Sequence, residues 1–179
     1  DLRMSRGLGD VYKRQLVDEA IACGYFKGID LIGSEKYSPE QYSLIFEKAH
    51  KSGMICMAHI GEYSDPILVM RYIEALNLDA IMHGITVVNS KEAMKLIRER
   101  KITLHLCPTS NVNLGYVESY ATHPIKYFIK NGIKVTINTD DRLIFGSSIT
   151  EEYIKLYKSG CLLAEELDKI RLDGLGFFK

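Results

Sequence analysis

The sequence has no apolar run long enough to cross a bilayer and no visible signal peptide. Its 23 lysines and arginines are balanced by 23 aspartates and glutamates, so the formal net charge is zero. A balanced charge gives no electrostatic attraction to nucleic acid or to a membrane surface, and we expect neither as a partner. With 46% hydrophobic and 26% charged residues, the chain is predicted to be an ordinary soluble globular protein.

Cysteine is scarce and irregularly spaced. Cys23, Cys56, Cys107 and Cys161 form no CxxC pair, and two of them lie within apolar strand patterns. Because this distribution favours buried free thiols, we expect a reducing compartment and place the protein in the cytoplasm.

Several motifs that define enzyme classes are also missing. The patterns GxGxxG and GxxxxGK[ST] are absent, which disfavours an open α/β sheet that binds nucleotide phosphates. Ser110 is not in a G-x-S-x-G elbow, which argues against a serine nucleophile. Cys107 could pair with His83 as a thiolate, but the sequence positions no third group, and we do not favour this pair.

The N-terminal segment matches a known adaptor sequence. Residues 5–15 are identical to the translation of a transposase adaptor used in DNA sequencing libraries, and residues 1–4 fit the flank of that adaptor. We therefore interpret residues 1–15 as a translated artefact, exclude them from fold reasoning, and treat residues 16–179 as one unit.

Five apolar runs recur along the rest of the chain, and a segment with helical punctuation separates each from the next. Ser38 and Asp65 each precede a proline, and Asn89 precedes Glu92 by three residues, as at helix starts. We expect strands at about 28–32, 54–59, 80–83, 102–107 and 134–139. Helices are expected at about 38–53, 65–76, 89–101, 124–131 and 150–158, with another from about 164.

The expected strands are apolar on both faces, which is typical of a parallel sheet covered by helices. The fold class is therefore α/β. Polar residues at the carboxyl ends of successive strands fit both a (β/α)8 barrel and a doubly wound sheet. Only five strands are visible, whereas a barrel needs eight.

The clearest chemical signal is the run Val135–Thr139, which ends in Asp140 and Asp141. Adjacent carboxylates repel each other unless a cation or hydrogen bonds stabilise them, so the pair indicates a metal or proton-transfer site. His59 and His83 follow two other strands and would share the same rim, where imidazole and carboxylate suit zinc or another borderline divalent ion. The alternative is structural, because such histidines are often only hydrogen-bonded and such aspartates often cap the next helix.

Glu62 lies three residues after His59 and could point into the same mouth. A carboxyl group partly closed from water has a raised pKa and can act as a general acid, although Glu62 could equally be a solvated loop residue. Gly33 and Gly61 would allow close approach of a ligand to the backbone, although most glycines at strand ends simply turn the chain.

The remaining histidines carry weaker signals. His50 lies beside lysines on a helix and is predicted to be solvated, whereas His105 lies within a strand and is predicted to be in the core. His123 precedes a proline at a helix start and is ambiguous.

Five segments resemble the adenosine deaminase family of metal-dependent hydrolases, and they occur in the family's order. The most specific are Cys107-Pro108-Thr109-Ser110-Asn111 and Asn138-Thr139-Asp140-Asp141. The others lie at 28–35, 58–62 and 82–84. The resemblance runs from about residue 16 to the end and implies part of a (β/α)8 TIM-type barrel.

The resemblance also implies roles for individual residues. His59 and Asp140 resemble ligands of a single Zn²⁺ ion, and Glu62 resembles the acid that protonates purine N1. His83 is similar to the histidine that orients the attacking water. Asp141 is similar to the group that hydrogen-bonds purine N7, and the backbone N–H of Gly33 would meet purine N3.

This chain departs from the family pattern in two ways. Arg142 stands where the family usually has proline, and no two histidines are separated by a single residue, so the family's His-x-His zinc ligands have no counterpart. The chain therefore resembles the C-terminal portion, with about five of the eight strands.

For the parent protein the resemblance implies hydrolytic deamination of adenosine or 2′-deoxyadenosine to the inosine product and ammonia. Adenine or AMP-type substrates are the alternative. The substrate partner would be a small-molecule purine nucleoside, and the chain alone is expected to be a non-catalytic fragment. Nothing in the sequence indicates the oligomeric state.

Overall fold

The computed structural model describes residues 8–35 and 37–176 of the chain. Within these ranges one sheet contains all five strands, and every pairing between neighbours is parallel. The strands are β1 (Gly28–Leu31), β2 (Ile55–Ile60), β3 (Ala80–His83), β4 (Thr103–Leu106) and β5 (Val135–Ile137). Their order in the sheet follows their order in the chain, as in consecutive βα units of a (β/α)8 barrel. The predicted α/β class and the five strand positions are confirmed.

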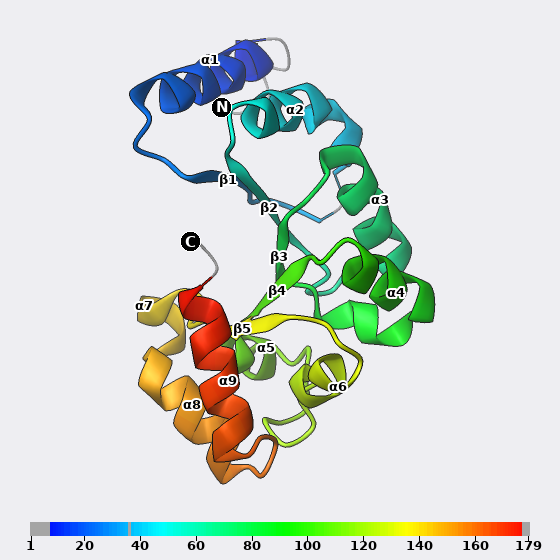
Figure 1. Cartoon of the computed structure of the whole chain (residues 1–179), viewed down its shortest axis with the longest axis vertical. Coiled ribbons are helices and arrows are strands. Elements are labelled where there is room, and N and C mark those ends of the chain that lie inside the picture. Colours follow the sequence, from blue (N-terminus) through cyan, green and yellow to red (C-terminus); the bar gives the residue numbers. More distant parts are fainter. Residues whose placement is uncertain (1–7, 36, 177–179) are drawn as a thin grey trace.

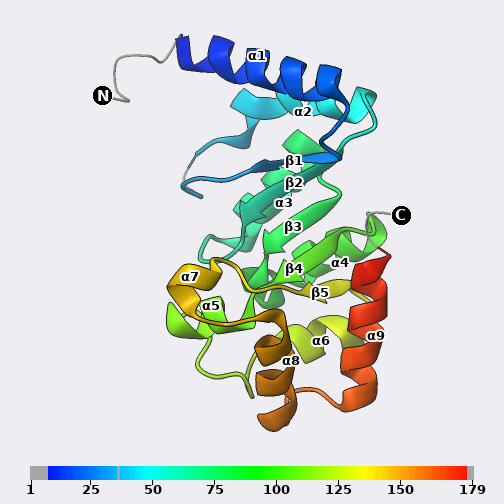
Figure 2. The same ribbon diagram turned by 90° about the vertical axis from the view of Figure 1, so that its left-hand side faces the viewer.

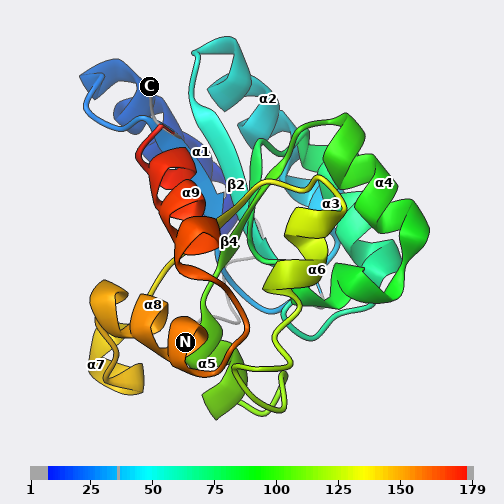
Figure 3. The same cartoon turned by 60° about the horizontal axis from the view of Figure 1, so that its bottom comes forward.

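Helices connect the strands and cover one face of the sheet. The α-helices are α1 (Leu8–Cys23), α2 (Ser43–Lys51), α3 (Pro66–Leu76), α4 (Lys91–Glu99), α5 (Pro108–Asn113), α6 (Ile125–Lys130), α7 (Arg142–Phe145), α8 (Ile149–Lys158) and α9 (Ala164–Leu175). Two 3₁₀ helices, η1 (Pro39–Tyr42) and η2 (Ile85–Asn89), precede α2 and α4. Helices α2, α3, α4 and α6 lie along the same side of the sheet, whereas α9 lies beside β5 (Figures 1 and 3).

Helix starts agree with the sequence signals in most cases. The Asp65 side chain accepts a hydrogen bond from the backbone of Ile67 and caps α3 as predicted. The third helix differs, because Ser90 rather than Asn89 provides the cap, accepting from the backbone of Ala93. Asn89 instead ends η2, a segment that the sequence pattern did not reveal.

Two short helices at the carboxyl end of the sheet were not expected. Helix α5 begins directly at Pro108, where the sequence had been interpreted as a strand end. Helix α7 begins after Asp141, whose carboxylate accepts from the backbones of Leu143 and Ile144. Both are too short to show the apolar periodicity by which longer helices are recognised.

Burial alternates along β2 and defines the two faces of the sheet. Cys56, Ala58 and Ile60 are fully buried on the helix-covered face, whereas Met57 and His59 on the other face are only half-buried. The main core lies between the sheet and its helices and includes Phe46, Ile73, Ile97, Leu104 and Phe128. The open face corresponds to the interior of a closed barrel.

The two edges of the sheet differ. Helix α9 packs along β5, whereas β1 has no second strand neighbour in the described part of the chain and its residues are half-buried (Figure 2). Among the described helices, none combines the length and apolar character needed to cross a bilayer.

Helix α1 includes part of the segment interpreted as an adaptor. Its C-terminal half contacts α2, with Asp18 paired to Lys48 and Ile21 packed on the core. Residues 1–7 lie outside the described residues, and the interpretation of residues 1–15 as a translated artefact stays a prediction.

Candidate active site

The carboxyl ends of the strands bring three of the predicted residues close together. Because β2 and β3 are paired in register, the rings of His59 and His83 lie 5.6 Å apart, measured between centroids. Asp140 follows β5, and its Oδ2 lies 3.9 Å from Nε2 of His83. His83 and Asp140 both have positive φ angles, 65° and 57°, so the backbone turns sharply at both positions.

His59 is held by a partner that the sequence reasoning missed. Its Nδ1 lies 3.0 Å from Oδ2 of Asp30 on the neighbouring strand β1. Burial lowers the pKa of His59, but the hydrogen bond and charge of Asp30, together with the charges of Asp140 and Glu62, raise it above its ordinary value. Since Nδ1 is engaged, a metal ion would bind through Nε2, with Asp30 fixing the orientation of the ring.

Glu62 has the electrostatic property that a general acid requires. Burial, with smaller contributions from the charges of Asp140 and Glu35, raises the pKa of Glu62 to about 7. Its Oε1 is buried without a hydrogen-bond partner and lies 3.6 Å from Nδ1 of His83. The carboxyl group therefore keeps its proton up to near-neutral pH.

Glu35 fixes the loop that carries Glu62, a role that no sequence pattern indicated. Its buried carboxylate accepts three backbone hydrogen bonds of 3.0 Å, from Gly61, Glu62 and Ser64. The loop is tight, because a Cβ at Gly61 would lie 3.0 Å from the Cα of Gly84. Gly61 thus permits a close backbone contact with Gly84, and its φ of 78° turns the chain, as in the structural alternative for a glycine at a strand end.

Replacement of Glu35 by glutamine in the intact protein is expected to destabilise it by about 1–3 kcal/mol, because the amide nitrogen would leave a buried backbone N–H without an acceptor. Urea unfolding of the variant and of Glu74→Gln, a change of an exposed carboxylate on α3, would measure the difference. Equal unfolding midpoints for the two variants would contradict the role of Glu35.

His83 is the buried end of a chain of side-chain hydrogen bonds. Its Nδ1 lies 3.3 Å from Nδ2 of Asn111, and Oδ1 of Asn111 lies 3.3 Å from Nε2 of His123. All three residues are buried, and burial lowers the pKa of both His83 and His123. His123, ambiguous in the sequence, is thus connected to the site. Asn111 was visible only as the last residue of the Cys-Pro-Thr-Ser-Asn motif.

The donor atoms near His83 suit a borderline divalent ion. His83, Cys107 and Asp140 each place one ligand atom within 4.8 Å of the others. Burial raises the pKa of the Cys107 thiol, which disfavours the thiolate that metal binding requires. His83 and Asp140 are the remaining members of this group, which does not include His59, the other ligand predicted from the sequence.

A second group of possible ligands, His50, Cys56 and Asp79, is engaged in holding the chain. Asp79 accepts from the backbone N–H of Cys56 at 2.8 Å, and Nε2 of His50 lies 2.5 Å from the carbonyl oxygen of Asn77. Burial and the charge of Asp79 raise the pKa of Cys56 to about 12. His50, predicted to be solvated, is half-buried and makes this contact with Asn77.

Asp141 directly follows Asp140, and its backbone N–H donates to Oδ1 of Asp140 at 2.8 Å. Asp141 is exposed and caps α7, which matches the structural alternative considered for it. Gly33 is exposed and lines a cavity of about 150 Å³ together with His59.

Arg142, the departure noted in the sequence, is the first residue of α7. His105 is buried, as predicted, and its Nδ1 contacts Oγ1 of Thr136.

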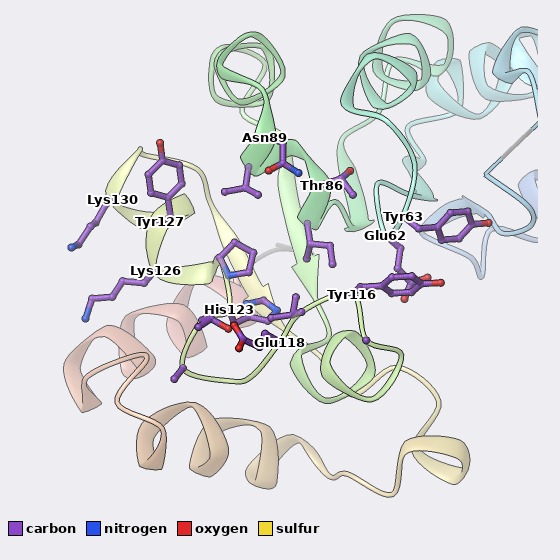
Figure 4. A pocket seen from close by; sticks show the side chains of 17 residues that line it. Glu62, Tyr63, Thr86, Asn89, Tyr116, Glu118, His123, Lys126, Tyr127 and Lys130 are labelled. Carbon is purple, nitrogen blue, oxygen red and sulfur yellow. The ribbon is translucent and has the colours of Figure 1, made fainter.

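A larger cavity of about 860 Å³ adjoins Glu62. Its walls come from the loop after β2, from η2, and from the segment between α5 and the end of α6. Glu62 and the stacked rings of Tyr63 and Tyr116 lie at one end, and Lys126 and Lys130 of α6 lie at the other (Figure 4). Of the residues assigned roles from the sequence, Glu62 alone lines this cavity.

Five parallel strands in chain order, with histidines and carboxylates at their carboxyl ends, have the arrangement of consecutive βα units in a TIM-barrel enzyme. The family model described as adenosine deaminase matches residues 13–176, and the chain belongs to this family.

Two curated relatives show the same relationship. An adenosine deaminase of Clostridium botulinum (strain Hall) is 41% identical over 143 residues, covering 79% of this chain and 42% of the relative. A putative adenosine/adenine deaminase of Treponema pallidum is 34% identical over 166 residues, covering 90% of this chain and 56% of the relative. The chain therefore spans about half the length of these relatives.

Solved structures confirm the fold. An adenine deaminase from Arthrobacter aurescens superposes with a TM-score of 0.86 at 23% identity, covering 94% of this chain and 52% of that one. A Burkholderia amidohydrolase with bound Zn gives 0.76 at 23% identity, over 90% and 48% of the two chains. The N6-methyl-AMP deaminase of Arabidopsis thaliana gives 0.84 at 19% identity, over 95% and 51%.

Proposed function

We propose that the protein to which this chain belongs removes the 6-amino group of adenosine or 2′-deoxyadenosine by hydrolysis, giving inosine or 2′-deoxyinosine and ammonia. The observation that carries the proposal is the half-buried carboxyl group of Glu62, which has a pKa of about 7 and lies beside His83. The 41% identity to an enzyme named adenosine deaminase supports the choice of substrate.

In this proposal Glu62 donates its proton to purine N1, which makes C6 more electrophilic. His83, whose Nε2 lies 3.9 Å from Oδ2 of Asp140, orients the attacking water and stabilises the charge that develops during attack at C6. Asp141 hydrogen-bonds purine N7, and the backbone N–H of Gly33 donates to purine N3. These two contacts orient the ring so that N1 faces Glu62.

His59 and Asp140 would hold a single zinc ion in the intact enzyme. Their donor atoms are a neutral imidazole nitrogen and a carboxylate oxygen, and a solved structural neighbour carries bound Zn. When bound, zinc would supply a Lewis acid that lowers the pKa of water to near neutrality.

The second candidate is a related purine substrate. Adenine is favoured by the adenine deaminase among the structural neighbours and by the adenosine/adenine relative from Treponema pallidum. An AMP-type substrate is favoured by the N6-methyl-AMP deaminase fold neighbour.

The buried cysteines Cys56, Cys107 and Cys161 support the proposed cytoplasmic location.

Steady-state assays on the intact protein test the proposal. We expect kcat/KM for adenosine and 2′-deoxyadenosine to exceed that for adenine and AMP. Turnover of adenine without turnover of adenosine would overturn the primary assignment, and preference for AMP would favour the nucleotide alternative.

A further inference from the structure

We propose that Asn111 and His123 are positioning residues that hold His83 in the tautomer with its proton on Nε2. Only the kinetic part of this inference rests on the proposed function.

The direction of the hydrogen-bond chain is set at its outer end by the protein backbone. The backbone N–H of Ile125 lies 3.2 Å from Nδ1 of His123. A backbone N–H can only donate, so Nδ1 of His123 accepts and the ring carries its proton on Nε2. The backbone carbonyl of His123 in turn accepts from the buried thiol of Cys161, at 3.8 Å, which helps to fix this segment.

The orientation of the Asn111 amide group then determines the tautomer of His83. Because Nε2 of His123 donates, the atom of Asn111 that faces it is the carbonyl Oδ1, at 3.3 Å. The amide nitrogen Nδ2 then faces His83 and donates to its Nδ1, also at 3.3 Å. A neutral imidazole that accepts at Nδ1 carries its proton on Nε2.

Burial protects the hydrogen-bond chain from water. His83 and His123 are each 3% exposed and Asn111 is fully buried, so water does not compete for these contacts. In the reversed hydrogen-bond chain, His123 would carry its proton on Nδ1, and this N–H would face the backbone N–H of Ile125. Two buried donors would then lack acceptors. The hydrogen-bond chain therefore presents the Nε2–H of His83 towards Oδ2 of Asp140, 3.9 Å away, while the Nδ1 lone pair accepts from Asn111.

The test uses the intact protein labelled with ¹⁵N-histidine, because long-range ¹⁵N–¹H spectra distinguish the two imidazole tautomers. Wild-type His83 should carry its proton on Nε2. In Asn111→Asp, a carboxylate oxygen replaces the donor Nδ2, so the His83 proton should move to Nδ1. The kcat for adenosine should fall about 10²- to 10⁴-fold with little change in KM.

Two substitutions of His123 separate positioning from packing. His123→Gln keeps a donor that can reach Asn111 and should retain the wild-type tautomer, whereas His123→Leu removes the donor and should give a mixture. As a matched control, His105→Gln changes another buried histidine that is not part of this hydrogen-bond chain, and should leave the His83 signals unchanged.

An unchanged Nε2–H signal in folded Asn111→Asp overturns the positioning role, whatever the activity. If the tautomer shifts as expected but the wild-type protein deaminates none of the purines tested, the proposed function fails and the positioning role stands. If both histidine variants shift the tautomer equally, the contribution of His123 is refuted.

Discussion

Replacement of Glu62 by glutamine in the intact enzyme is expected to lower kcat for adenosine by about 10²- to 10⁴-fold while zinc content stays unchanged. The amide has nearly the shape of the protonated carboxyl group but cannot deliver a proton to purine N1. Because Oε1 of Glu62 is buried and has no hydrogen-bond partner, little else in the fold depends on the ionisable group of Glu62.

The pH dependence gives a second readout of the same residue. With its pKa raised to about 7, Glu62 holds the required proton below that pH and loses it above. The wild-type kcat/KM should therefore fall as pH rises through about 7, and the residual rate of Glu62→Gln should lack this decline.

Zinc analysis and a control complete the experiment. Metal content per protein, measured for wild type and variant, should be equal, since Glu62 is not a proposed ligand. Glu74→Gln, on the exposed side of α3, should keep wild-type kinetics. Loss of zinc from Glu62→Gln, or turnover retained by it, would refute the role of general acid.

The 179-residue chain by itself is expected to form no inosine above background, even with added zinc. Catalytic zinc sites generally have three protein ligands, and this chain supplies His59 and Asp140 without the family's His-x-His pair. His83 lies near but has its Nδ1 engaged by Asn111.

The chain alone is also expected to self-associate. Strand β1 has an open edge, and apolar side chains that would face a barrel interior, such as Met57, are half-buried. Around the rim, Ile32, Leu143 and Ile144 are 71%, 97% and 73% exposed. Packing of α9 along β5 protects the other edge, so we expect association through the β1 side.

Light scattering after size-exclusion chromatography would detect the association, and a coupled assay for inosine would test activity. The preparation must be free of host deaminase, which a mock purification controls. Inosine formation that zinc chelation abolishes would contradict the inactivity of the fragment, and a stable monomer would contradict the exposed-edge argument.

The sequence by itself determined the class of fold and the residue types on the rim. Strand positions were readable because each run is short, apolar and followed by helix signals, and these patterns depend on neighbours in the chain. The same local patterns identified His59, His83 and Asp140 as residues at strand ends, which would meet at one edge of the sheet.

Only the tertiary structure decided how these residues are controlled. Asp30 reaches His59 from the next strand, and Glu35 reaches the loop of Glu62 across 26–29 positions of sequence. Asn111 contacts His83 from 28 residues away, and the pKa of Glu62 depends on burial by the whole fold. Such contacts leave no periodic trace in the sequence, because they depend on which strand ends become neighbours in space.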